Sequence, residues 1–219
     1  MKRYVLETDR YTIKEVFGVS SDSEIMYEPN YNVMPGHSMP VIIGNDNRKI
    51  VRSIWGLDPD NSETSVYELE HEAFTKENSE FSLKDFSPCL IPALGFYKWK
   101  ETVDDPLPFY LRVITQDVLG VAGLWDTQSE SFAVLTMQAN ALVEPLDNRM
   151  PVILDPKEFE EWLSEGVSDM IKNGFSGNQL LPNMSVFRVP ELVNDPSNNS
   201  KELIQPIPKL RNYDGEDED

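Results

Sequence analysis

The chain has 219 residues, 40% of them hydrophobic, and its 38 acidic against 19 basic residues give a net charge of -19. This length supports one well-buried core and is short for two domains. The acidic excess opposes DNA binding driven by bulk charge, and no apolar run approaches the length of a membrane-spanning helix.

The N-terminal half predicts a short helix and then a β-hairpin. We expect a helix over about residues 9–17, ended by Gly18. Val41–Ile43 and Lys49–Val51 are apolar runs on either side of a Gly- and Asn-rich turn at residues 44–47, in which Gly and Asn supply the positive φ of a tight turn.

The second half predicts three strands followed by a long helix. Residues 111–115, 121–125 and 131–137 are β-branched or aromatic runs bounded by polar turns. From the N-cap Asp155, apolar residues repeat at helical spacing as far as Ile171, and Gly174 ends the helix. We therefore expect an α+β fold with a mainly antiparallel β core and a few peripheral helices. A single domain over residues 1–210 would be followed by an acidic, disordered tail over residues 211–219.

Nine short motifs lie in a fixed order along the chain, from Arg3 to the region around Arg149. They are Arg3-Tyr4, Pro29-Asn30-Tyr31-Asn32-Val33-Met34-Pro35-Gly36, Trp55-Gly56-Leu57, Ser62-Glu63-Thr64, Cys89-Leu90-Ile91-Pro92-Ala93, Gly95-Phe96-Tyr97-Lys98-Trp99-Lys100, Ala122-Gly123-Leu124-Trp125, Thr136 with Asn140, and Arg149-Met150-Pro151. Together they resemble the SOS response-associated peptidase (SRAP) family, which shields abasic sites in single-stranded DNA.

The resemblance implies a covalent reaction whose chemical positions this chain replaces. In the family, a processed N-terminal Cys offers its amine and thiol to the aldehyde of an abasic sugar, and a thiazolidine ring forms. The family begins Met-Cys-Gly-Arg-Phe/Tyr, whereas this sequence reads Met1-Lys2-Arg3-Tyr4, so we assign Lys2 to the Cys position. The family's Glu and His, which move protons, are here Lys98 and Asp147. These replacements predict that no catalytic set is intact.

The single cysteine, Cys89, lies in an apolar run and is expected to be a core residue. One Cys and two His make a poor ligand set, so we expect no metal and no cofactor. The first ten residues carry charges at positions 7, 9 and 10 and lack the apolar stretch of a signal peptide, which favours a cytoplasmic protein without membrane attachment.

Five residues match the family's nucleic-acid contacts and form a candidate DNA-binding remnant: Asn32, Pro35, Trp55, Glu63 and Arg149. The resemblance implies that Lys2, Arg3, Lys98 and Arg149 gather near Glu63 and Asp147. Trp55 and Pro35 would either stack on bases or pack the core. Arg149 would either contact a phosphate or pair with nearby acids. Nine acids between Asp58 and Asp85, against two lysines, predict weak or no binding of single-stranded DNA.

Lys98 and Asp147 carry the opposite charges to those implied for their positions in the family. We therefore expect them to form an ion pair that holds the site together without chemistry.

Two functions remain open. The chain is either a non-catalytic binding or regulatory module with a basic protein partner, or a residual lyase in which the Met1 α-amine, Lys2 or Lys98 forms a Schiff base with an abasic site.

Overall fold

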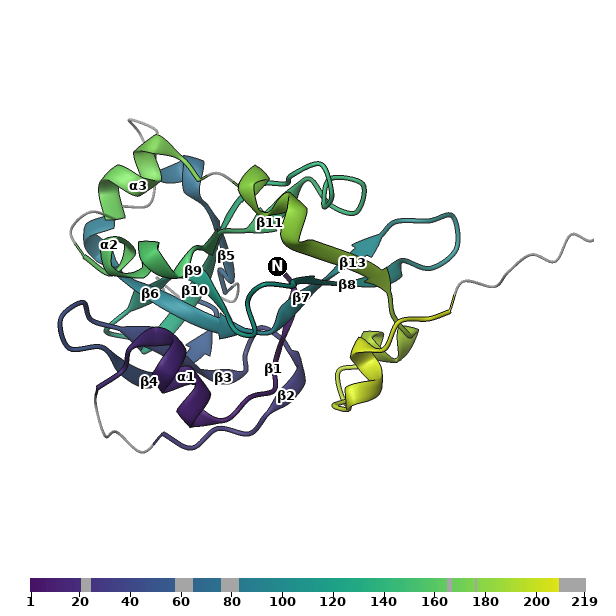
Figure 1. The fold of residues 1–219 in the computed structure, drawn as a ribbon, viewed down its shortest axis with the longest axis horizontal. Helices are drawn as coiled ribbons and strands as arrows, with labels where there is room; N and C mark the ends of the chain where they lie inside the picture. Colours follow the sequence, from purple (N-terminus) through teal and green to yellow (C-terminus); the bar gives the residue numbers. More distant parts are fainter. Residues whose placement is uncertain (21–24, 58–64, 76–82, 165–166, 176, 209–219) are drawn as a thin grey trace, which may run out of the picture.

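Two β-sheets pack across a shared core in the computed structural model, which describes residues 1–20, 25–57, 65–75, 83–164, 167–175 and 177–208 (Figure 1). The first sheet is antiparallel, in the order β13-β8-β7-β1-β2. Its strands are β1 (Arg3–Leu6), β2 (Asn30–Val33), β7 (Gly95–Lys100), β8 (Leu107–Val113) and β13 (Met184–Arg188).

The second sheet closes on itself. Its order is β11-β10-β4-β3-β6-β9-β12, β5 pairs with β10, and a pairing between β9 and β10 joins β3, β4, β10, β9 and β6 into a ring. The strands are β3 (Ser38–Ile43), β4 (Lys49–Trp55), β5 (Glu68–Glu70), β6 (Ser87–Ala93), β9 (Leu119–Asp126), β10 (Ser131–Gln138), β11 (Arg149–Pro151) and β12 (Ile153–Leu154). Only β10 runs parallel to its neighbours β4 and β5, so the predicted, mainly antiparallel α+β fold is confirmed.

The predicted hairpin and first helix are present. β3 and β4 pair in register around Gly44, whose φ is 83°, although the asparagines of this turn keep negative φ. Helix α1 (Arg10–Phe17) begins after Asp9, whose carboxylate accepts a hydrogen bond from the Thr12 amide. It ends at Gly18, which adopts the left-handed conformation expected of a glycine at the C-terminal end of a helix.

The long helix predicted from Asp155 to Ile171 is wrong in its middle. The predicted capping box at Asp155 and Glu158 is present. Helix α2 (Phe159–Trp162) nevertheless stops at Trp162, and α3 (Val167–Asn173) starts afresh. Ser164 and Gly166 lie in the sequence between them. Both have a low intrinsic helix propensity, which the spacing of the apolar residues does not reveal.

Six 3₁₀ helices complete the described elements. They are η1 (His71–Thr75), η2 (Leu83–Asp85), η3 (Pro156–Glu158), η4 (Gly177–Asn183), η5 (Glu191–Asn194) and η6 (Lys201–Ile204). No helix in the described part of the chain combines the length and the apolar character that a membrane crossing requires.

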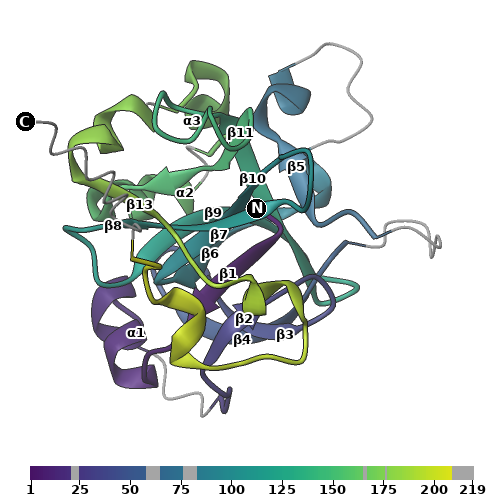
Figure 2. The ribbon, with the colours of Figure 1, turned by 90° about the vertical axis from the view of Figure 1, so that its right-hand side faces the viewer.

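The first sheet is covered on both faces. On one face, Tyr4 and Phe96 pack into the main core. On the other face, Val5 and Tyr97 pack against the C-terminal segment, residues 189–207. This segment, yellow in Figure 2, lies in front of β1 and β2. The predicted acidic tail, 211–219, lies outside the described residues.

The N-terminus lies inside the molecule, where β1 meets β7 between the two sheets (Figure 1). Met1 is fully buried. Cys89, on β6, is also fully buried, as predicted, and burial raises the pKa of its thiol, which leaves it a core residue without thiolate reactivity.

Candidate functional site

An ion pair between Lys98 and Asp147 occupies the centre of the candidate site. Lys98 lies on β7 with its side chain 4% exposed, and its Nζ donates to Asp147 Oδ2 at 2.7 Å. Asp147 lies just before β11, and its other oxygen accepts the Arg149 backbone amide at 2.9 Å. The turn around Asp147 therefore fixes the carboxylate opposite the ammonium, and the predicted ion pair is confirmed.

The surroundings of this pair act on its two pKa values. Burial lowers the pKa of Lys98, the hydrogen bond and charge of Asp147 oppose this shift, and the positive charges of Lys2 and Arg149 add to it. Burial alone would raise the pKa of Asp147, but the hydrogen bonds from Lys98 and from the Arg149 amide outweigh it, and the net shift is downward. The net shift of the Lys98 pKa is downward, and Asp147 is the group that opposes loss of its proton.

The Met1 α-amine is the other nitrogen at this site. It contacts the carboxylate of Glu68 on β5 and is fully buried. Burial lowers the pKa of this amine well below its usual value of 8.0, and the nearby positive charge of Lys98 lowers it further. Burial and the charge of Lys98 therefore both favour the neutral form of this amine.

Lys2 does not take the cysteine's place. Its side chain is exposed and lines a small pocket of about 270 Å³ together with Lys98 and Asp147. Counted back from Arg3, the family's cysteine falls on Met1 and its glycine on Lys2. The assignment of Lys2 to the cysteine position is therefore corrected: the Met1 amine lies innermost.

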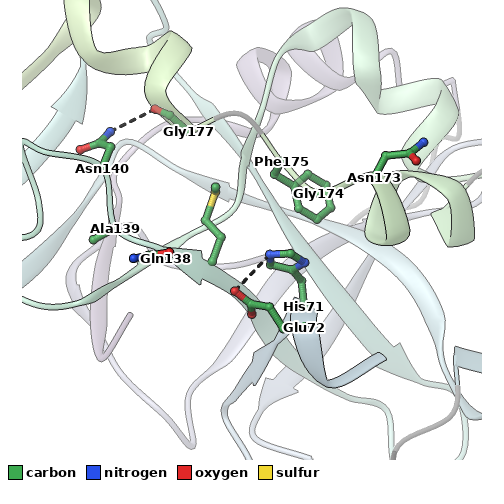
Figure 3. Close-up of a pocket in the computed structure, with 10 residues that line it drawn as sticks. His71, Glu72, Gln138, Ala139, Asn140, Asn173, Gly174, Phe175 and Gly177 are labelled. Carbon is green, nitrogen blue, oxygen red and sulfur yellow. Dashed lines mark hydrogen bonds and ion pairs between the residues drawn. The ribbon is translucent and has the colours of Figure 1, made fainter. Parts of the chain in front are cut away.

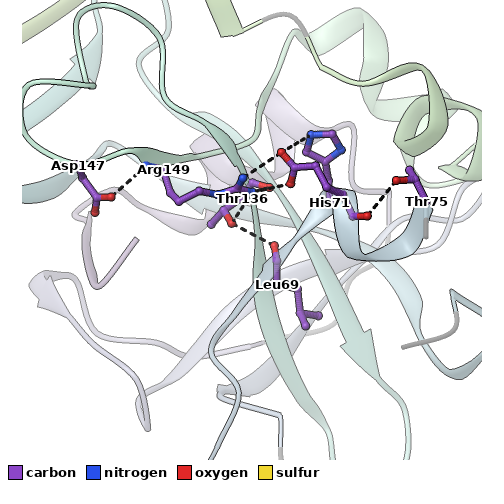
Figure 4. Close-up of polar contacts among 7 residues, drawn as sticks. Leu69, His71, Thr75, Thr136, Asp147 and Arg149 are labelled. Carbon is purple, nitrogen blue, oxygen red and sulfur yellow. Dashed lines mark hydrogen bonds and ion pairs between the residues drawn. The ribbon is translucent and has the colours of Figure 1, made fainter. Parts of the chain in front are cut away.

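Arg149 is held by an acidic partner. Its Nη1 and Nη2 donate to the two carboxylate oxygens of Glu72 at 2.9 and 2.8 Å, and Nη2 also donates to the Thr136 carbonyl at 2.6 Å (Figure 4). His71 Nε2 lies 3.3 Å from the same Glu72 carboxylate. Of the two interpretations of Arg149, pairing with a nearby acid describes this structure.

Arg3 faces away from the site, contrary to expectation. It pairs with Tyr97 across β1 and β7, so its side chain lies on the opposite face of the sheet from Lys98. There it donates to Asn32 Oδ1 at 3.1 Å and to the Val193 carbonyl, and its guanidinium lies 5.6 Å from the ring centre of Trp99. The predicted cluster of four basic groups therefore lacks Arg3, because side chains alternate between the two faces of a strand.

Asn32 anchors the C-terminal segment. The side chain is 1% exposed, and its amide nitrogen lies 3.1 to 3.3 Å from the carbonyls of Val193, Asp195 and Asn198. This use of its donors makes Asn32 a structural residue in the described conformation and leaves no exposed amide for a nucleic acid.

Trp55 is a core residue, which decides between its two interpretations. It is 1% exposed, its ring stacks on Phe132 at 6.2 Å between centres, and its Nε1 donates to the Tyr67 carbonyl. Pro35 is half-buried beside Gly36 in the turn between β2 and β3. Glu63 lies outside the described residues.

Sequence reasoning missed Glu68 and Glu72 as site residues. Both belong to the acidic stretch between Asp58 and Asp85, whose charge in the sequence argues only against DNA binding, yet one contacts the Met1 amine and the other the Arg149 guanidinium. The pairing of β5 with β10 places them at the site, and nothing in the neighbouring sequence predicts that pairing.

A larger cavity of about 600 Å³ lies beside the Arg149 pair. Glu72, His71 and Phe175 line one side, and Gln138, at the end of β10, and Asn140 line the other (Figure 3). Within the described residues, no three His, Cys, Asp or Glu side chains lie close enough together to hold a metal ion.

Comparisons with known proteins place the chain in a family. The family model for SOS response associated peptidase (SRAP) matches residues 2–196. The abasic site processing protein YoqW of Bacillus subtilis is 30% identical over 224 residues, covering 93% of this chain and 98% of that protein. YoaM of Bacillus subtilis, also an abasic site processing protein, is 28% identical over 196 residues, covering 81% of this chain and 85% of its own length. The crystal structure of a Bacteroides thetaiotaomicron protein superposes with a TM-score of 0.73 at 18% identity, covering 94% of this chain and all of that one, and supports the fold. The chain belongs to the SOS response-associated peptidase family.

Proposed function

We propose that this chain is a non-catalytic member of its family that acts as a binding or regulatory module. The observation that carries the proposal is the Lys98–Asp147 ion pair, which occupies the positions of the proton-transferring Glu and His implied by the family resemblance. The buried Lys98 and the partly exposed Asp147 neutralise each other, hold each other in place and offer no free acid or base near neutral pH.

The state of Lys98 decides whether it attacks an aldehyde. An amine is a nucleophile only after it has lost its proton, because the ammonium has no free electron pair. Asp147 lies within hydrogen-bond distance and stabilises the protonated form. The pair therefore opposes Schiff-base formation by Lys98.

The charge of the protein supports a partner other than DNA. A net charge of -19 repels a nucleic acid at long range, and Arg149 already has Glu72 on its guanidinium. A protein with a basic surface is the complementary class of partner, because opposite fields speed encounter and favour binding.

Borohydride trapping tests this proposal. The protein is mixed with single-stranded DNA that carries one abasic site, with and without borohydride, and adducts are resolved on a denaturing gel and mapped by peptide mass. We expect no adduct at Lys98 in the wild-type protein. A borohydride-dependent adduct on Lys98 would contradict the proposal.

A second candidate function, an amine-based lyase, is favoured by one observation. The Met1 amine is buried beside Lys98, and burial lowers its pKa well below the usual value, which favours the neutral, nucleophilic form in a protein that begins at Met1. Its nitrogen would add to the sugar aldehyde, water would leave, and an imine would form that borohydride reduces to a secondary amine. An adduct mapping to Met1 alone would support this candidate over the first.

A further inference from the structure

Outside the Lys98 pair, Glu72 and Arg149 form a bidentate ion pair. Two parallel N–H···O bonds, at 2.9 and 2.8 Å, join the guanidinium to the carboxylate. On its inner side the guanidinium is held by Thr136, through the carbonyl at 2.6 Å and the hydroxyl at 3.2 Å. The fork of Arg149 therefore has a fixed direction, with the Glu72 carboxylate bound to its two terminal nitrogens.

The two partners differ in exposure. The Arg149 side chain is 20% exposed and the Glu72 side chain 37%. Glu72 belongs to η1, 77 residues away along the chain, whereas Arg149 and Thr136 belong to the paired strands β11 and β10. The arginine is thus built into the sheet, and the carboxylate reaches it from a separate element on the solvent side.

A guanidinium fork binds a carboxylate and a phosphate in the same way, with two parallel hydrogen bonds to two oxygens of one anion. A carboxylate in this position therefore uses the two hydrogen-bond donors that a phosphate would use. The cavity of about 600 Å³ next to Glu72 leaves room for its carboxylate to move away from Arg149 (Figure 3).

We propose that Glu72 is an intramolecular competitor of nucleic-acid phosphate at Arg149, and that it sets how weakly this chain binds single-stranded DNA. This inference rests on the proposed function, in which DNA is not the preferred partner. A DNA phosphate can bind Arg149 only after Glu72 has moved aside. The free energy of breaking the Glu72–Arg149 pair therefore reduces the affinity for DNA.

The test measures binding of a fluorescent single-stranded oligothymidylate at low salt to wild-type protein and to Glu72→Gln. Removing the competing charge should tighten binding at least about fivefold, and the slope of log affinity against log salt should steepen by about one phosphate contact. Arg149→Gln added to Glu72→Gln should return the affinity to the wild-type value, because the gain requires the released guanidinium.

Glu191→Gln is the matched control. Glu191 pairs with Arg188 at 3.1 Å on the exposed surface and loses the same single charge on substitution. An equal gain in Glu191→Gln would mean that net charge alone is responsible and would overturn the inference, as would no gain in Glu72→Gln. Glu72→Ala is measured in parallel, and thermal melting of every variant verifies that it is folded. Tight binding by the wild-type protein itself would contradict the proposed function, whereas the inference depends only on the difference between the variants.

Discussion

The ammonium of Lys98 and the carboxylate of Asp147 lie 2.7 Å apart, yet only one of the two reaches solvent. The Lys98 side chain is 4% exposed and that of Asp147 33%. Loss of either partner therefore has a different consequence, because water can solvate a lone Asp147 but hardly reaches a lone Lys98.

Asp147→Ala should destabilise the protein by about 3 kcal/mol, because it leaves a buried ammonium without its counter-charge. Lys98→Met, which keeps the buried stem, should cost only about 1 kcal/mol, and the double variant should resemble Lys98→Met. Urea unfolding measures all three free energies. Glu191→Ala, from an exposed pair, serves as the reference at under about 1 kcal/mol, and an Asp147→Ala value no larger than this would refute the asymmetry.

Asp147→Ala should also release the reactivity of Lys98. Without the group that raises its pKa, the remaining influences of burial, Lys2 and Arg149 all lower the pKa of this amine. Each unit of lowering increases the neutral fraction about tenfold while the group is mostly charged. We expect a borohydride-trapped adduct with abasic single-stranded DNA that maps to Lys98 and is absent from the Asp147→Ala/Lys98→Met double variant. An adduct of equal yield at Lys98 in the wild-type protein would show that Asp147 does not control the amine.

Acid should weaken the fold through Asp147 and Glu72. For both carboxyls burial alone raises the pKa, but hydrogen bonds from Lys98 and Arg149 outweigh it and the folded pKa lies below its usual value. Such a group stabilises the fold fully above its unfolded pKa of about 4, and the contribution is lost as the pH falls through the lower folded pKa. Urea midpoints from about pH 5 to about pH 3 should therefore fall less steeply in Asp147→Asn and in Glu72→Gln than in the wild-type protein. Parallel curves for all three proteins would exclude this linkage.

Asn32→Ala should loosen the C-terminal segment. The side chain holds the carbonyls of Val193, Asp195 and Asn198, and loss of these contacts should cost about 2 to 3 kcal/mol. Hydrogen exchange should accelerate over residues 190–205 before it does so in β10. Asn47→Ala, at an exposed turn position, should leave exchange there unchanged. Weakened DNA binding with unaltered exchange would instead favour a direct role of Asn32 in binding.

Much of the fold was predictable because its signals are local. Asp9 and Gly18 mark the two ends of α1, and Gly44 marks the hairpin turn. The long helix was mispredicted because an apolar stripe continues past Leu163 and Ser164, where the described backbone is no longer helical. Periodicity reports which residues are buried and does not report whether the helix is continuous.

The candidate site was predictable only where the family pattern fixed the positions. The Lys98–Asp147 pair follows from two exchanged charges at matched positions. The direction of Arg3 depends on its register opposite Tyr97, and the contacts of Glu68 and Glu72 depend on where β5 and η1 pack. Contacts between residues this far apart in the sequence cannot be predicted from the residues next to them.

Covalent capture without a reductant is the most direct test of whether this member processes abasic sites. The wild-type protein is incubated with excess single-stranded DNA carrying one abasic site, heated in denaturant and resolved on a gel, with intact-mass analysis of every band. The Lys98–Asp147 pair predicts that all protein migrates unmodified. A heat-stable conjugate of protein and DNA would contradict it.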